Sequence, residues 1–210
     1  MKGLILKDLA LIKLQMRSMI IVFALVIFLL VAGKDTSFAI MYANIIFMML
    51  GLTTLNYDAF DNGEAFLFTL PITKKLYVKE KYIISICGLL LGFLISLILL
   101  VVIKGAGAED ISFATGYMMG GIVFLSIMLP VDLKFGPEKG RIAMIAVMIA
   151  IIASVYAIAD IANKLNMEDY FGELTHIGVP ALLGFLAIVD LIILFISYKI
   201  SCRIMDKKEF

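Results

Sequence analysis

The sequence predicts an all-α membrane protein: a single transmembrane domain over residues 1–210 that crosses the bilayer six times. Apolar residues make up 63% of the chain, whereas soluble proteins average about half. These residues gather in stretches close to the ~20 residues that a helix needs to cross the ~30 Å hydrocarbon layer. The predicted spans are 18–33, 36–57, 82–103, 111–131, 142–159 and 177–198, of which the first is short.

The positive charges alternate between the two sides of this arrangement. Fifteen of the eighteen Lys and Arg residues lie before the first span, in the loop 58–81, after the fourth span, or after the sixth. Only Lys34, Lys104 and Lys164 lie in the other loops. Because basic loops stay on the cytoplasmic side, this pattern predicts cytoplasmic N and C termini in a multi-pass protein of the cell membrane.

Residues 1–17 precede the first span and carry both apolar and basic side chains. Ile5, Leu9, Ile12 and Met16 form an apolar stripe at helical spacing. We expect an amphipathic helix that lies in the cytoplasmic interface and then turns into the first span. The alternative is a plain start to one long tilted helix.

The loop 58–81 is the longest of the predicted cytoplasmic loops. Acidic residues open it and basic residues close it, and Pro71 divides it because proline disfavours helix at the preceding residue. Thr73 can cap a second helix that continues into the third span. A helix, a break and a helix indicate a docking surface for a cytoplasmic partner. The alternative is an interfacial helix that only orients the neighbouring spans.

Two polar residues lie inside predicted spans. Asp190 lies near the middle of the sixth span, where a carboxylate costs roughly 2.5–3.5 kcal/mol and should face a bundle interior or a wet cavity. Asn44 in the second span is a possible partner for it. The Asp190 carboxyl could carry protons or bind substrate, or it could be a hydrogen-bonded group that fixes packing.

Small residues recur at four-residue spacing in the predicted spans, which indicates close helix packing in lipid. Gly88, Gly92 and Ser96 form one such ridge, and Gly116 and Gly120 form another. This spacing does not say whether the packing partner belongs to the same chain or to a second copy.

The motifs of several enzyme classes are absent from the sequence. It has no G-x-x-x-x-G-K-[ST] loop for ATP, no H-E-x-x-H and no G-x-S-x-G. Its two cysteines and single histidine do not form a metal-ligand pattern, and nothing indicates nucleic-acid binding. We therefore expect no catalytic residue, metal or cofactor in this chain.

Two segments carry a resemblance to a known family. The segment Tyr57–Ile83 resembles the loop between spans two and three of ABC-2 type permeases of ATP-binding-cassette exporters. In this family the loop carries acidic residues, a glycine, a Leu-Pro pair, basic residues and a Lys-Tyr pair. The matching residues here are Asp58, Asp61, Gly63, Glu64, Leu70, Pro71, Lys74, Lys75, Lys81 and Tyr82. The family's proline, Lys-Phe-Gly and basic end fall on Pro130, Lys134, Phe135, Gly136 and Arg141, and the opening MKGLILKDL is also similar.

This resemblance implies a permease subunit of a bacterial exporter, with two permease chains (alike or different) and two separate ATPase subunits that bind ATP and Mg²⁺. Its loop 58–81 would supply the coupling helix that docks on the ATPase, through Asp58, Phe60, Asp61, Gly63, Glu64, Phe66, Leu67 and Phe68, before the break at Leu70 and Pro71. Lys134, Phe135, Gly136 and Lys139 would add a minor contact. The similar branch exports amphipathic peptides, such as phenol-soluble modulins and antimicrobial peptides.

Two other functions stay open on the sequence. A proton-coupled secondary transporter would use Asp190 for coupling, and a membrane immunity or accessory protein would transport nothing itself. Internal repeats and broken helices mark many secondary transporters, and no convincing symmetry relates the two halves of this chain.

Overall fold

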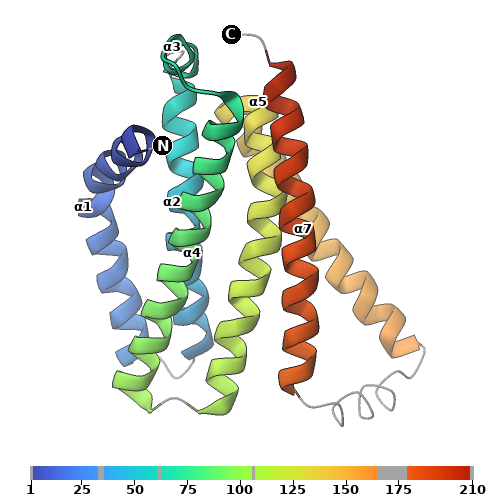
Figure 1. Cartoon of the computed structure of the whole chain (residues 1–210). Helices are drawn as coiled ribbons and strands as arrows, with labels where there is room; N and C mark the ends of the chain where they lie inside the picture. Colours follow the sequence, from blue (N-terminus) through green and yellow to red (C-terminus); the bar gives the residue numbers. More distant parts are fainter. Residues whose placement is uncertain (1, 33–35, 61–62, 106, 165–178, 209–210) are drawn as a thin grey trace.

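A computed structural model describes residues 2–32, 36–60, 63–105, 107–164 and 179–208 of the chain. Within these ranges the secondary structure is helical, with no strand. The predicted all-α class is therefore confirmed (Figure 1). The helices are α1 (Lys2–Ala32), α2 (Thr36–Ala59), α3 (Gly63–Thr69), α4 (Lys74–Lys104), α5 (Ala108–Lys164) and α7 (Val179–Lys207).

Four segments of the described residues are long and apolar enough to cross a membrane. They are Ile40–Ala59, Lys74–Val102, Asp110–Gly136 and Leu183–Lys207. They correspond to the second, third, fourth and sixth predicted spans. The crossings predicted over 18–33 and 142–159 lie in α1 and in the second part of α5, and they stay predictions, as does the total of six.

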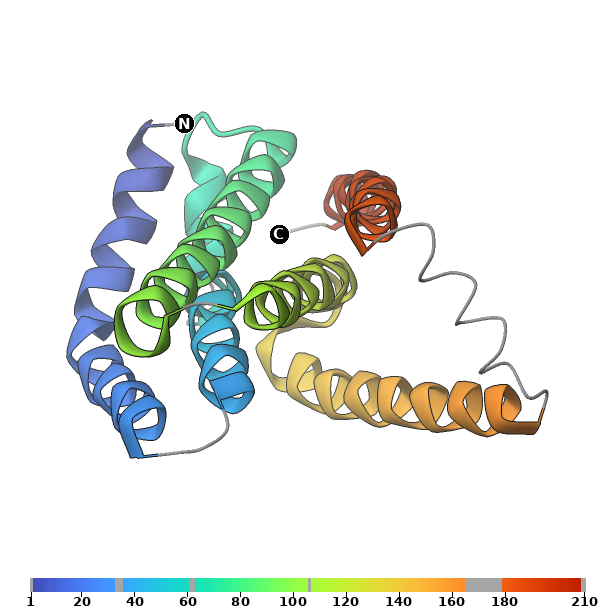
Figure 2. The same cartoon turned by 90° about the horizontal axis from the view of Figure 1, so that it is seen from below.

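α5 contains a sharp break that the sequence pattern did not locate. Spans four and five were expected to be joined by a loop over residues 132–141, but the helix continues to Gly136 and resumes directly after it. Gly136 has φ 75° and ψ 176°, a backbone conformation that only glycine adopts readily. Pro137 explains the position of the break, because proline disfavours helix at the residue before it and suits the first turn of the next helix. Figure 2 shows the part of α5 after the break leading away from the other helices.

The closest helix packing joins α2 to α4 and depends on small residues. A Cβ atom at Gly88 would lie 2.8 Å from the Phe47 carbonyl oxygen, and one at Gly92 would lie 2.7 Å from the Phe47 Cβ. The first small-residue ridge therefore packs within the chain. Around Gly116 and Gly120, by contrast, an added Cβ would meet nothing within 4 Å.

The main hydrophobic core lies among α1, α2, α4, α5 and α7. Buried side chains from all five helices contribute to it, including Leu4, Leu52, Leu55, Val78, Tyr82, Leu129, Leu133 and Met205. This core fixes the helix ends from which the functional segments extend.

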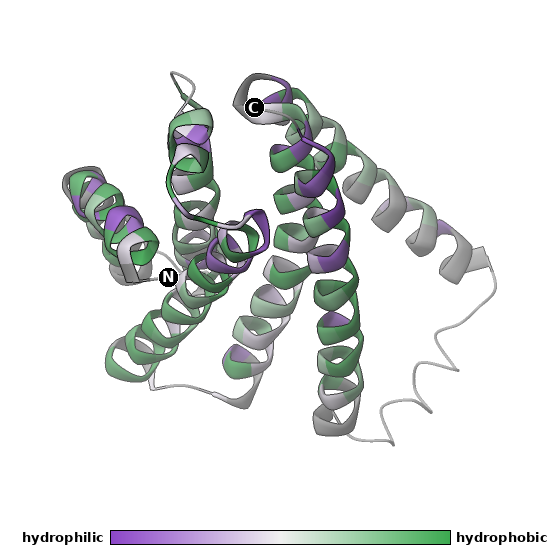
Figure 3. Cartoon of the chain, turned by 45° about the horizontal axis from the view of Figure 1, so that its top comes forward, coloured by the Kyte–Doolittle hydropathy of each residue, from purple (hydrophilic) through white to green (hydrophobic). Residues whose placement is uncertain are grey.

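Both ends of the described chain lie at the same end of the molecule, together with α3 and the break in α5 (Figure 1). Hydrophilic residues gather at this end of α4 and α7, while most of their remaining length is hydrophobic (Figure 3). We call it the basic end, because the four predicted basic segments meet there. Its cytoplasmic location stays a prediction.

α1 is one helix over its whole length, although its direction changes part-way (Figure 1). Leu4 and Asp8 are buried against the bundle, while Leu6, Leu9 and Leu14 are exposed. The predicted helix over 1–17 and the span over 18–33 are therefore parts of a single element. The interfacial position of the first part stays a prediction.

Candidate functional site

The segment around α3 has the helix, break and helix that the sequence predicts. α3 ends at Thr69, and the Ile72 amide donates to the Leu70 carbonyl at 2.6 Å across Pro71. α4 then begins at Lys74 behind Thr73, whose hydroxyl accepts from the Leu76 amide at 3.3 Å. The predicted cap at Thr73 is confirmed. We refer to residues 58–73 as the coupling segment.

The coupling segment has an inward side that is held by the rest of the chain. Glu64 is buried, and Lys208 from the end of α7 donates to its carboxylate at 2.5 Å. Phe68 packs edge-to-face on Tyr77 of α4, with ring centroids 5.6 Å apart. Gly63 lies so close to α2 that an added Cβ would be 2.7 Å from the Asp58 carbonyl oxygen. These contacts orient α3 rather than leaving it as a free loop.

Its outward side is apolar and exposed. Phe66 is 70% exposed, Phe60 is 65% exposed, and Leu70 is also exposed, whereas Leu67 and Phe68 are half-buried against the core. The residues expected to meet an ATPase therefore separate into an exposed set, which contains Phe60 and Phe66, and a buried set, which contains Asp58 and Glu64. Asp61 lies outside the described residues.

Below α3, buried charges join three helices in a group that we call the ionic cluster. Lys81 of α4 contacts Asp8 of α1 at 2.5 Å and Asp58 of α2 at 2.6 Å, and all three side chains are almost fully buried. Lys7 pairs with Asp58 and also lies 3.1 Å from Asp8. The hydroxyl of Tyr77 donates to Asp58 at 3.2 Å. This network connects the N-terminal helix to the start of the coupling segment.

Both α1 members of the ionic cluster are held in their charged forms. Burial alone raises the pKa of the Asp8 carboxyl, but Lys81 and Lys7 outweigh it and bring the pKa below its ordinary value. Burial lowers the pKa of Lys7, yet its contacts with Asp58 and Asp8 raise it overall. Asp8 and Lys7 are therefore both charged at neutral pH.

The sequence did not anticipate this cluster. Lys81 was expected among the basic residues of a cytoplasmic loop, but its side chain is fully buried. The partners Asp8 and Lys81 are 73 positions apart, so no local pattern connects them. A third buried acid, Glu80, lies 3.9 Å from Lys81, and neither of its carboxyl oxygens has a hydrogen-bond partner among the described residues.

The end of α7 closes over the coupling segment and the neighbouring helices. Lys74 of α4 donates to the Lys208 carbonyl at 2.6 Å, and the Lys208 amine lies 3.4 Å from the Leu133 carbonyl of α5. About two turns further along α4, the Tyr82 hydroxyl lies 2.6 Å from Ser197 and 2.8 Å from Ser201 of α7. The position of α7 is thereby coupled to that of α3.

The two polar residues inside the spans have different surroundings. The Asn44 amide donates to the Ile40 carbonyl at 3.0 Å and to Ser96 of α4 at 3.3 Å, which places it in the α2–α4 packing. Asp190 is buried, and its Oδ2 has no hydrogen-bond partner among the described residues. Among the described residues, no hydrogen bond joins Asn44 to Asp190, the possible partners suggested by the sequence.

A groove of about 380 Å³ lies between α2 and α5. Four of its lining residues are methionines, and the open ridge of Gly116 and Gly120 forms part of its wall. Asn44 and Tyr117 contribute polar groups to this mostly apolar surface. We call it the methionine groove.

The second predicted contact region lies at the break of α5. Phe135 and Lys134 are exposed there, with the Lys134 amine 5.0 Å from the Phe135 ring centre, and Lys139 is exposed just beyond Gly136. This region lies at the basic end, as α3 does (Figure 1).

Comparison with known protein families matches residues 3–206 to a family described as ABC-2 family transporter protein. The chain belongs to this family. The match covers nearly the whole sequence and confirms the resemblance at the level of the ABC-2 permeases. Neither the curated proteins nor the solved structures contain a match to this chain.

Membership of the ABC-2 family, together with the apolar helices, makes this chain a multi-pass membrane protein and the permease part of an ABC transporter. Such a subunit provides transport and does not itself catalyse a reaction. The family therefore favours the permease hypothesis over a proton-coupled transporter built on Asp190.

Proposed function

We propose that this ABC-2 protein is the permease subunit of an ATP-driven exporter of amphipathic peptides, and that a separate ATPase subunit drives it through the coupling segment. The observation that carries the proposal is the two-sided construction of α3. Its inward side is fixed by Lys208 and Tyr77, while Phe60 and Phe66 are exposed. Exposed aromatic side chains on a rigid support are typical anchors of protein interfaces.

The contacts of α3 supply a route for mechanical coupling. A force applied to Phe66 reaches α7 through Glu64 and Lys208, and it reaches α4 through Phe68 and Tyr77. The ionic cluster then links α4 to α1 and α2 through Lys81. Displacement of α3 by an ATPase would thus move several membrane helices together.

The methionine groove supports an amphipathic peptide as the cargo. Methionine side chains are flexible and polarisable, so they adapt to varied apolar side chains, and Asn44 offers one polar contact. The uncovered ridge of Gly116 and Gly120 is suited to a second permease chain, because small residues let helices approach closely in lipid. A second chain there would enclose the groove as a path.

The experiment replaces Phe66 with alanine and measures the affinity for the ATPase subunit that co-purifies with the wild-type protein. Loss of an aromatic anchor is expected to cost about 2 kcal/mol, roughly 30-fold in affinity. Phe113→Ala is the matched control. Phe113 is also an exposed phenylalanine, but it lies near the start of α5 and outside the coupling segment. Binding of the Phe66 variant at the strength of the control would contradict the proposal.

A further inference from the structure

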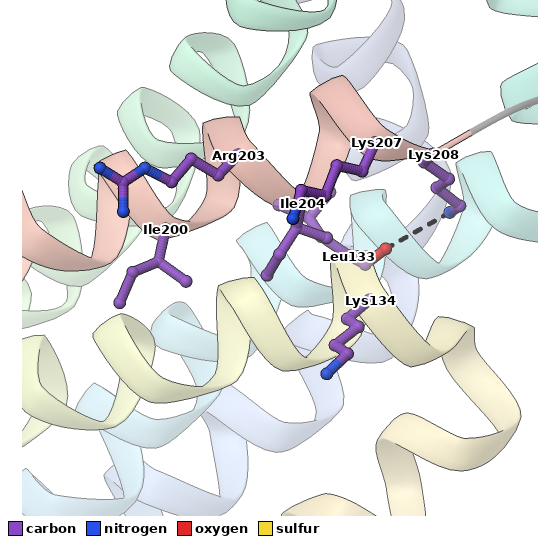
Figure 4. Close-up of a pocket in the computed structure, with 7 residues that line it drawn as sticks. All are labelled: Leu133, Lys134, Ile200, Arg203, Ile204, Lys207 and Lys208. Atoms are coloured by element: carbon purple, nitrogen blue, oxygen red, sulfur yellow. Dashed lines mark hydrogen bonds between the residues drawn. The ribbon is translucent and has the colours of Figure 1, made fainter.

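A second groove, of about 500 Å³, lies between the ends of α5 and α7 at the basic end. Figure 4 shows its lining, with Leu133 and Lys134 on α5 and the other residues at the end of α7. The floor is apolar and the rim is basic. The lining residues are Leu133, Lys134, Ile200, Arg203, Ile204, Lys207 and Lys208.

Three of the four cations around this groove lack a counter-charge. Lys208 is engaged by Glu64 and by the Leu133 carbonyl, and Figure 4 shows its amine directed toward that carbonyl. Lys134, Arg203 and Lys207 pair with no carboxylate of the described residues. Positive charges that converge from two helices without an acid repel one another, and an anion in the groove would relieve that repulsion.

The apolar floor continues along α7 into the membrane. Ile192, Ile196 and Ile200 recur every four residues before Ile204, and they are 54%, 52% and 44% exposed. At 1.5 Å per residue, the track from Ile192 to Ile204 is roughly 18 Å long, about the depth of one leaflet. The cations Arg203 and Lys207 lie beside its upper end.

We propose that this groove binds an anionic glycerophospholipid. Its phosphate would lie among Lys134, Arg203 and Lys207, and one acyl chain would follow the isoleucine track. A free phosphate would pair with the basic rim but leave the exposed isoleucines uncovered. A phospholipid would pair with the rim and also cover the isoleucines. Basic pockets between membrane helices are suited to anionic headgroups. The proposal does not depend on an ATPase, and it assigns Lys134 to lipid rather than to the minor ATPase contact.

The test counts bound lipid by native mass spectrometry of the purified protein in detergent that contains equal phosphatidylglycerol and phosphatidylcholine. The site variant carries Lys134→Gln, Arg203→Gln and Lys207→Gln. The control carries Lys13→Gln, Lys75→Gln and Lys79→Gln, which remove the same charge from exposed positions outside the groove. Each cation is expected to contribute about fivefold, so the site variant should bind phosphatidylglycerol on the order of 100-fold more weakly, while the control retains it.

Three results would overturn the proposal. Equal phosphatidylglycerol binding by the site variant and the control would show that the groove is not the lipid site. Displacement of the lipid by inorganic phosphate at equal concentration would show that a free anion suffices. If the site variant keeps its lipid but no longer binds the ATPase subunit, the groove is a protein contact instead. If the triple variant does not fold, Arg203→Gln alone should still weaken lipid binding about fivefold, and no change in that variant would refute the proposal.

Discussion

At the scale of single residues, Lys81 sets the relation between three helices. A buried ammonium is unfavourable unless opposite charges surround it, and here Asp8 and Asp58 lie at 2.5 and 2.6 Å. Its amine also lies over the Tyr77 ring, 5.4 Å from the ring centre. Lys81 therefore holds α1, α2 and α4 together through buried ion pairs. It is not one of the solvent-exposed basic residues of a loop.

Replacing Lys81 with methionine should destabilise the protein strongly. The substitution keeps the volume of the side chain but removes the buried cation between Asp8 and Asp58, and the partly exposed Lys7 is left as their counter-charge, which costs about 3–5 kcal/mol. Thermal unfolding of the detergent-purified protein measures this loss. Lys79→Met is the control, because Lys79 is exposed two positions earlier and its change should stay within about 0.5 kcal/mol. Equal melting temperatures for the two variants would show that the contacts of Lys81 do not hold the three helices together. Neutralising Asp8 and Asp58 together in the Lys81 variant should restore part of the lost stability.

At the scale of elements, the break in α5 directs a whole helix out of the bundle. One residue with φ 75° and ψ 176° separates two helical segments that would otherwise be collinear. Gly140 lies just beyond it, and a Cβ there would be 2.3 Å from the Asp132 carboxylate, so the two sides of the break pack closely. Glycine is demanded by the backbone at Gly136, whereas a side chain at position 140 would first have to displace the Asp132 carboxylate.

Alanine at position 136 should be costly. A side chain in this backbone region costs about 1–3 kcal/mol, because Cβ clashes with the local backbone. Gly184→Ala is the matched control: Gly184 lies inside α7 with open space around it, so alanine should be neutral or stabilise the fold by about 0.5–1 kcal/mol. Melting temperatures should move in opposite directions. A Gly136 variant as stable as the wild-type protein would show that the break is not conformationally demanding.

The elements also show which features a sequence can predict. The apolar stretches located the membrane helices, and Pro71 with Thr73 located the break before α4, because these signals act within a few residues. Hydropathy alone was a poorer guide to helix ends, since residues 132–141 were predicted as a loop but are helical on both sides of Gly136. Hydropathy reports where the lipid contacts a helix, and the helix itself continues into the water. The burial of Lys81 and the pairing of Glu64 with Lys208 had no local signal, because their partners are distant in sequence.

At the scale of the whole molecule, the basic segments of the chain converge on one end, and the joint between α4 and α5 lies at the other (Figure 1). This arrangement makes a specific prediction about sidedness. With Cys87 and Cys202 removed, single cysteines at Lys75, Lys139 and Gly107, all exposed, should report the side of each end. A membrane-impermeant maleimide added to intact cells should label position 107 and leave 75 and 139 unlabelled.

The same assay tests the crossing predicted over 142–159. If that segment spans the bilayer, a cysteine at Asp160 should be labelled from outside as position 107 is. Protection of position 160 in intact cells, with labelling after the cells are opened, would show that 142–159 does not cross the bilayer.

The contact between Glu64 and Lys208 joins residues 144 positions apart. During synthesis, α3 leaves the ribosome long before its anchoring lysine exists, and it gains its final orientation only when α7 has been made and inserted. A polypeptide that lacks Lys208 would present Phe66 without this ion pair to orient α3. A single contact thus makes the orientation of α3 depend on a residue beyond the end of α7.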